Sequence, residues 1–139
     1  MSLNKKVIKG LGEIALRVEN LDRSQEFYEK IIGLELMRRF DDAAFFRITE
    51  GVEGHTQILA LFDRSKQIGY EGICAGKSTV DHIAFGISRS DYESEKKRLQ
   101  DLGFEVSIAE HAWVKWRSLY LYDPDGNNVE LVCFDESVK

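Results

Sequence analysis

The chain contains an internal repeat. The segment from Gly10 to Leu36, GLGEIALRVENLDRSQEFYEKIIGLEL, is echoed by the segment from Thr79 to Val106, TVDHIAFGISRSDYESEKKRLQDLGFEV. Each copy predicts a short apolar strand, an amphipathic helix that ends at a glycine, and a second strand. A repeat constrains the architecture more than a local signal does, because both copies are expected to fold as the same unit. The alignment also superposes Glu13 on His82, and both are residue types that bind metal ions.

The two copies continue into further strands. In the first, a strand at 13–18 precedes a helix that Asn20 or Asp22 can cap and that Gly33 ends, and three strands follow at 34–39, 44–48 and 56–62. In the second we expect a strand at 82–87, a helix at 90–102, and strands at 104–108, 118–122 and 128–134. A turn at DPDG separates the last two strands.

These elements predict an α+β fold built from two tandem βαβββ modules within one domain, residues 1–139. Module one covers about residues 10–63, a Gly-containing linker about 64–78, and module two about 79–135. A single βαβββ unit leaves one face of its sheet uncovered. Two curved sheets are therefore expected to close around a shared cleft, with the helices outside.

Composition limits the function classes. The 139 residues carry a net charge of −5 with both signs interspersed, so neither nucleic acid nor a membrane surface is an expected partner. The longest apolar runs are too short to span a bilayer, and no signal-peptide pattern opens the chain. Cys74 and Cys133 form neither a disulfide framework nor a CxxC site, which favours a cytoplasmic protein with reduced thiols.

Four segments, ALRVENLDRSQEFYEKIIGLEL, DHIAFGI, DLGFEV and LYLYDPDGNNVEL, carry a resemblance to a known family. The chain resembles the vicinal oxygen chelate superfamily of glyoxalases, extradiol dioxygenases, fosfomycin- and bleomycin-resistance proteins and methylmalonyl-CoA epimerases. The family takes its metal ligands from the first and last strands of each module. The resemblance therefore implies Glu13, His82 and Glu130 as ligands. The fourth position falls at Ile58, Leu59 or Ala60, depending on register, and none of these binds a metal.

Such a site would hold a divalent ion, namely Mn, Fe, Ni or Zn. Three protein ligands leave positions open for a substrate that chelates the ion through two neighbouring oxygens. The extradiol dioxygenases use two histidines and one carboxylate, so Glu13 departs from their pattern. The plain alternatives are a solvated Glu13, a hydrogen-bonded core His82 and a surface-paired Glu130.

Two more residues fit the dioxygenase branch of the family. There, a second histidine and a tyrosine precede the final glutamate ligand, and His111 and Tyr120 stand at the corresponding places. With Glu130 they form the predicted catalytic set, because an imidazole and a phenol beside a metal can hydrogen-bond an oxyanion and move protons. The alternatives are aromatic packing for Tyr120 and a surface loop for His111.

The resemblance implies a metal-dependent enzyme with glyoxalase-like (lyase or isomerase) or dioxygenase chemistry, acting on a small molecule and assembling as a homodimer. The alternative is a metal-free binding protein of the bleomycin-resistance kind. The missing fourth ligand favours that alternative, and the three retained ligands disfavour it. A regulatory module is a third possibility, without a positive signal in the sequence.

Overall fold

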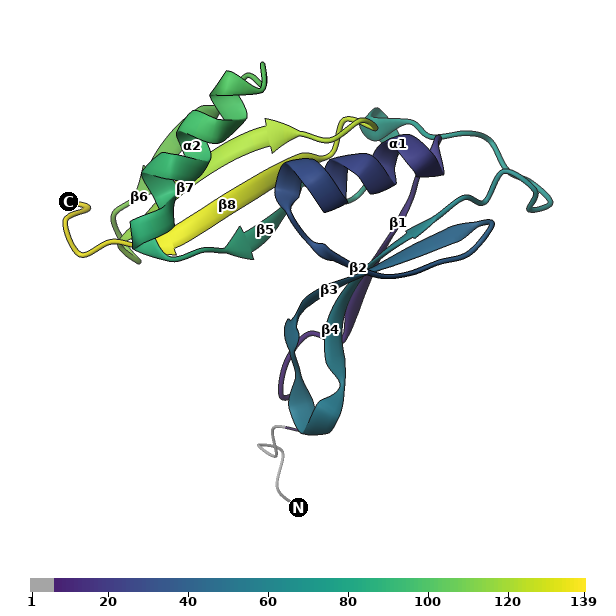
Figure 1. Ribbon diagram of the computed structural model, residues 1–139, viewed down its shortest axis with the longest axis horizontal. Helices are drawn as coiled ribbons and strands as arrows, with labels where there is room; N and C mark the ends of the chain where they lie inside the picture. The colour runs from purple at the N-terminus through teal and green to yellow at the C-terminus, as the bar shows by residue number, and fades with distance from the viewer. Residues whose placement is uncertain (1–6) are drawn as a thin grey trace. The chain divides into compact units, whose positions relative to one another are not determined.

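The computed structural model describes residues 7–139, and these fold into two compact units. The first extends to residue 73 and the second begins at residue 74, so the boundary falls inside the predicted linker. Each unit contains one four-stranded sheet and a helical segment (Figure 1). The prediction of an α+β fold with two βαβββ modules is confirmed. The shared cleft and the single domain remain predictions.

The first unit forms a mixed sheet with strand order β1-β4-β3-β2, in which β1 runs parallel to β4 and the other pairs are antiparallel. Its elements are β1 (Glu13–Arg17), α1 (Leu21–Glu26), a π-helix (Phe27–Ile32), β2 (Glu35–Arg39), β3 (Ala43–Glu50), a 3-10 turn (Val52–Gly54) and β4 (Thr56–Phe62).

The helical segment of this unit begins and ends where the sequence predicts. Oδ1 of Asn20 accepts a hydrogen bond from the backbone N–H of Arg23 at 3.0 Å, which makes Asn20 the cap. Gly33 ends the segment with φ of +92°, a left-handed conformation that glycine adopts without steric cost. The second half is a π-helix, and the N–H of Gly33 donates to the carbonyl of Tyr28 at 3.2 Å.

The second unit repeats the arrangement with strand order β5-β8-β7-β6, and β5 is parallel to β8. Its elements are a 3-10 turn (Ala75–Lys77), β5 (His82–Gly86), a 3-10 turn (Arg89–Asp91), α2 (Tyr92–Asp101), β6 (Ser107–His111), β7 (Trp116–Tyr122) and β8 (Asn128–Phe134). Figure 1 shows α2 beside the ribbons of β6, β7 and β8.

The position predicted for one strand is wrong. We expected a strand at 104–108, and β6 is at 107–111. Its register is set by pairing with β7, which places Ser107 opposite Tyr120 and His111 opposite Trp116. The apolar residue Phe104 instead follows the left-handed Gly103 in the turn that leaves α2.

The two faces of the second sheet differ in chemistry. Ile83 and Phe85 of β5 are buried, whereas His82 and Ala84, which alternate with them, are exposed. On the helix side, the Tyr92 hydroxyl of α2 donates to the carbonyl of Ser118 at 2.8 Å. The opposite face carries the polar residues His82, Tyr120 and Glu130.

Among residues 7–139, none of the helices combines the length and the apolar character needed to cross a membrane. Cys74 is exposed and Cys133 is buried, and both are free thiols.

Candidate functional site

Four predicted residues converge on the polar face of the second sheet. His82 begins β5, Glu130 lies within β8, Tyr120 lies within β7 and His111 ends β6. Tyr120 of β7 is the strand partner of Glu130. On the other side of β8, the partner of Glu130 is Ala84 of β5, two residues after His82. Because side chains alternate between faces, all four project from one face.

Glu130 is at the centre of this cluster, with its side chain only 7% exposed. Its Oε2 lies 3.9 Å from Nε2 of His82, and its Oε1 lies 3.8 Å from Nε2 of His111. The two carboxylate oxygens therefore each face a different imidazole. Nε2 of His111 is also 3.2 Å from the Tyr120 hydroxyl, and the rings of His82 and Tyr120 meet edge to face at 6.4 Å.

The environment keeps the Tyr120 phenol protonated. Burial raises the pKa of Tyr120 above its usual value of 10.0, and the neighbouring Glu130 carboxylate raises this pKa further, because a negative charge disfavours a phenolate. A protonated phenol is a hydrogen-bond donor at neutral pH. The hydroxyl of Tyr120 can thus donate towards Glu130 while it accepts from His111.

His82 is oriented by a residue that sequence reasoning missed. Oδ2 of Asp81 lies 2.7 Å from Nδ1 of His82. A proton held on Nδ1 by the carboxylate leaves the lone pair of the ring on Nε2, the nitrogen that faces Glu130. This is the pairing by which proteins orient metal-binding histidines. The available signal was the carboxylate directly before His82 in the DHIAF segment.

The donor set of the cluster fits a divalent ion. One carboxylate and an oriented imidazole are ligands that Mn²⁺, Fe²⁺, Ni²⁺ and Zn²⁺ accept. With metal–ligand bonds of about 2.1 Å, adjacent donor atoms lie roughly 3.0–3.4 Å apart. The 3.9 Å between His82 and Glu130 is slightly longer. Accordingly, within the described part of the chain, no three His, Cys, Asp or Glu side chains already form a ligand set.

The corresponding position in the first unit carries no ligand. Glu13 begins β1 as an exposed residue and pairs with Ile58, while Ala15 pairs with Ala60. Since Ala84 pairs with Glu130 in the second unit, Ala60 is the counterpart of Glu130. The register thus selects Ala60 from the three predicted positions. The role of Glu13 as a ligand remains a prediction.

The family model "Glyoxalase/Bleomycin resistance protein/Dioxygenase superfamily" matches residues 10–131. Metallothiol transferase FosB of Staphylococcus haemolyticus is 31% identical over 128 residues, which cover 90% of this chain and 84% of that protein. The manganese-dependent 2,3-dihydroxybiphenyl 1,2-dioxygenase of Geobacillus genomosp. 3 is 34% identical over 104 residues, which cover 74% of this chain but 29% of the dioxygenase.

A solved structure agrees with these relatives. The genomically encoded fosfomycin resistance protein FosX from Listeria monocytogenes superposes with a TM-score of 0.66 at 25% identity, covering 94% of this chain and 97% of its own. The repeated βαβββ topology, the residues on the polar face of the second sheet and the family match over residues 10–131 lead to one conclusion: the chain belongs to the glyoxalase/bleomycin resistance protein/dioxygenase superfamily.

Proposed function

We propose that the chain is a metal-dependent enzyme whose small-molecule substrate chelates the metal through two adjacent oxygens. The observation that carries the proposal is the buried carboxylate of Glu130, which has an imidazole within 4 Å of each oxygen. A buried carboxylate is costly unless charges or hydrogen bonds compensate it. A divalent cation would compensate this one.

Glu13, His82 and Glu130 would hold the ion. When bound, a divalent metal acts as a Lewis acid that stabilises negative charge developing on the substrate oxygens. Mn, Fe, Ni and Zn are all compatible with this donor set, and the name of the dioxygenase relative favours manganese.

The remaining residues of the cluster would orient the substrate and move protons. Tyr120, kept protonated by its surroundings, would donate a hydrogen bond to a substrate oxyanion. Nε2 of His111 is in contact with the same hydroxyl and would accept a proton that passes through it. Glu130 would accept an acidic C–H proton if its carboxylate turned towards the substrate. The chain would thereby supply its own path for this proton, from Glu130 through Tyr120 to His111.

The reaction that the enzyme catalyses depends on which chemistry of the superfamily uses this proton path. Lyase or isomerase chemistry needs a carboxylate base next to a bound oxyanion, and extradiol-type oxygenation needs a histidine and a tyrosine beside the metal. A third route is suggested by FosB and FosX, whose names indicate thiol transfer and fosfomycin resistance. We further propose that the enzyme is a cytoplasmic homodimer.

Metal-free ligand binding of the bleomycin-resistance kind is the less favoured function. A metal-free cleft has no need for a buried carboxylate facing two imidazoles, and an apolar residue of similar volume would be less costly at Glu130.

Metal analysis tests the proposal directly. Protein purified without chelator should retain close to one divalent ion per site, as measured by inductively coupled plasma mass spectrometry. His82→Ala and Glu130→Gln should each lose it, and Glu13→Gln should weaken it. Glu105→Gln, which alters an exposed carboxylate outside the site, is the matched control. Unchanged metal content in His82→Ala would refute the proposed metal site.

Turnover assays then separate the chemistries. The metal-loaded protein is assayed with the methylglyoxal–glutathione adduct, with catechols, and with fosfomycin in the presence and absence of a thiol. We expect turnover of one class, and a loss of about 100-fold in Tyr120→Phe that is mainly in kcat. Equal turnover by wild type and Tyr120→Phe would remove the phenol from the mechanism.

A further inference from the structure

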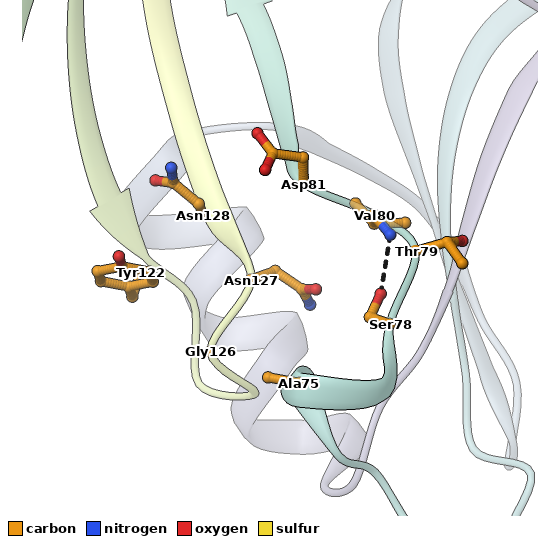
Figure 2. Close-up of a pocket in the computed structure, with 9 residues that line it drawn as sticks. All are labelled: Ala75, Ser78, Thr79, Val80, Asp81, Tyr122, Gly126, Asn127 and Asn128. Carbon is orange, nitrogen blue, oxygen red and sulfur yellow. Dashed lines mark hydrogen bonds between the residues drawn. The ribbon is translucent and has the colours of Figure 1, made fainter.

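The two imidazoles beside Glu130 are held in different ways. Asp81, whose Oδ2 lies 2.7 Å from Nδ1 of His82, directly precedes β5 and lines a cavity of about 370 Å³ beside the turn into β8 (Figure 2). The ring of His111 lacks such a carboxylate on Nδ1. Within the described part of the chain, its polar contacts are made by Nε2, at 3.2 Å to the Tyr120 hydroxyl and 3.8 Å to Oε1 of Glu130. The orientation of His111 therefore depends on the strand that carries it.

That strand is weakly held at this end. β6 is an edge strand of its sheet, and His111 is its last residue. The turn that follows is closed by two long hydrogen bonds of 3.3 Å, from the N–H of Val114 to the carbonyl of His111 and from the N–H of Lys115 to the carbonyl of Ala112. Lys115 also has φ of +56°, which is unfavourable for a residue with a side chain. The end of such an edge strand frays readily unless other contacts hold it.

Arg117 of β7 supplies those contacts from the helix side of the sheet. Its Nη1 lies 2.7 Å from Oε1 of Glu110, and its Nε donates to Oδ2 of Asp135 at 2.8 Å. Glu110 is the strand partner of Arg117 in β6 and directly precedes His111. Asp135 directly follows β8. One planar guanidinium, which can bind two carboxylates at once, therefore joins the end of β6 to the end of β8.

Asp135 is a firm anchor because the C-terminal residues hold it in turn. Its side chain is 7% exposed and also accepts a hydrogen bond from Nε of Arg89 at 2.7 Å. Its backbone N–H donates to the carbonyl of Lys115 at 2.8 Å. Nζ of Lys115 donates to the carbonyl of the buried Val138 at 3.1 Å. The C-terminal residues are thus bonded to the hairpin that joins β6 and β7.

We propose that Arg117 is a positioning residue for His111. Consecutive residues of a strand point to opposite faces, so a contact that fixes Glu110 on the helix side also fixes the direction of His111 on the polar face. Nε2 of His111 then stays within reach of the Tyr120 hydroxyl. This inference rests on the proposed function, in which His111 accepts the proton that passes through Tyr120.

Glu110 is the point at which this network can be cut with the least damage to the fold. Its side chain is 49% exposed, and ion pairs of exposed carboxylates contribute little to stability. Glu110→Ala removes the link from Arg117 to β6 and leaves the buried Asp135 carboxylate with its two arginine partners. Glu93→Ala is the matched control, because it removes an exposed carboxylate that lies 3.3 Å from Lys96 on α2.

NMR of the full-length protein, without added metal or substrate, tests the positioning. The wild type should give a nuclear Overhauser effect between the imidazole protons of His111 and the ring protons of Tyr120, because the two side chains are in contact. This cross-peak should lose at least half of its intensity in Glu110→Ala and none in Glu93→Ala. Glu110→Gln should retain it, since the amide oxygen still accepts a hydrogen bond from Arg117. A cross-peak of wild-type intensity in Glu110→Ala would overturn the proposal.

Kinetics distinguish positioning from a structural role. With the substrate class that the turnover assays identify, Glu110→Ala should lower kcat roughly 10- to 100-fold and leave KM unchanged, because a misplaced proton acceptor slows the reaction without altering binding. Metal content should also be unchanged, since His82 and Glu130 belong to β5 and β8. Glu110→Gln should recover most of kcat. A raised KM with wild-type kcat in Glu110→Ala would contradict the proposal.

The result is separable from that of the metal experiment. If the cross-peak persists in Glu110→Ala while His82→Ala still loses the metal, the positioning proposal fails and the proposed function stands. If Glu110→Ala loses the cross-peak but the wild type holds no metal, the positioning of His111 stands and the metal proposal fails.

Discussion

Oδ2 of Asp81 lies 2.7 Å from Nδ1 of His82, while Nε2 of the same ring is 3.9 Å from Oε2 of Glu130. The imidazole is therefore held between two carboxylates, one on each nitrogen. The exposed carboxylate fixes which nitrogen carries the proton, and the buried one is left facing the lone pair.

Removal of the exposed carboxylate should weaken metal binding without abolishing it. Asp81→Ala frees the His82 ring and its tautomer, and losses of roughly 10- to 100-fold in metal affinity are typical of such changes. Titration with Mn²⁺, followed by isothermal calorimetry, measures the loss. Asp101→Ala, which removes an exposed carboxylate paired with Lys97 on α2, is the control. An affinity equal to that of the wild type in Asp81→Ala would contradict an orienting role.

The raised pKa of Tyr120 makes stability depend on alkaline pH. The folded protein holds this proton more tightly than the unfolded chain, whose tyrosines titrate near 10.0. The stabilisation is complete below pH 10.0 and is lost as the pH rises through the folded-state pKa. Urea unfolding above and below pH 10.0 should show a smaller alkaline loss of stability in Tyr120→Phe than in the wild type.

Spectroscopy provides an independent check on the same residue. A pH titration of the folded wild type, followed by phenolate absorbance, should include one tyrosine that titrates above pH 10.0. That transition should be missing from Tyr120→Phe. Tyr92, whose pKa burial also raises, should remain in that titration. If the variant and the wild type give superimposable titration curves, the pKa of Tyr120 is not raised.

A buried carboxylate near the C-terminus makes stability depend on acidic pH. Nε of Arg89 and Nε of Arg117 donate to Oδ2 of Asp135 at 2.7 and 2.8 Å, and the Ser137 hydroxyl donates to Oδ1 at 2.7 Å. Hydrogen bonds from Ser137 and Arg117 hold the pKa of Asp135 well below its usual 3.8.

The folded protein thus binds a proton at the Asp135 carboxylate more weakly than the unfolded chain does. The resulting stability is present above pH 3.8 and is lost as the pH falls towards the folded-state pKa. Asp135→Asn should be less stable than the wild type at pH 7 and should lose less on acidification, as measured by urea unfolding. Asp101→Asn should follow the pH profile of the wild type. Parallel profiles for Asp135→Asn and the wild type would disprove this role.

The glycines that end the two helical segments should be equally intolerant of side chains. Gly33 and Gly103 both have φ of +92°, and alanine in the left-handed region costs roughly 1–2 kcal/mol. Gly33→Ala and Gly103→Ala should each lower the free energy of unfolding by about this amount in chemical denaturation. Gly76→Ala, at a glycine without positive φ and with open space at its Cβ, should cost much less. A large loss in Gly76→Ala would show that the cost is not conformational.

The repeat allowed most of the fold to be predicted because it is a local pattern that occurs twice. Glycines at Gly33 and Gly103, apolar alternation in the strands and the DPDG turn are all properties of short segments. The π-helix at 27–32 was not predictable, because the spacing of Phe27 and Ile31 is the same in the sequence for an α-helix and a π-helix.

The site was predictable in its residue types but not in its contacts. The local pattern predicts a strand that ends at Ile108, so it leaves open a loop position for His111. Pairing with β7 extends that strand to His111 and brings the imidazole to Tyr120. Such pairing depends on residues distant in the sequence, and so does the buried, unpartnered oxygen of Asn128.

Glu130 and Ala60 occupy the same register position in the two units. They differ in what limits their replacement by other residues. Ala60 is fully buried, so its replacement is limited by the volume of the core. Replacement of Glu130 is limited by the need for its two carboxylate oxygens. At this register position the first unit therefore tolerates residues according to their size and shape, whereas the second unit tolerates only residues that supply a carboxylate to its neighbours.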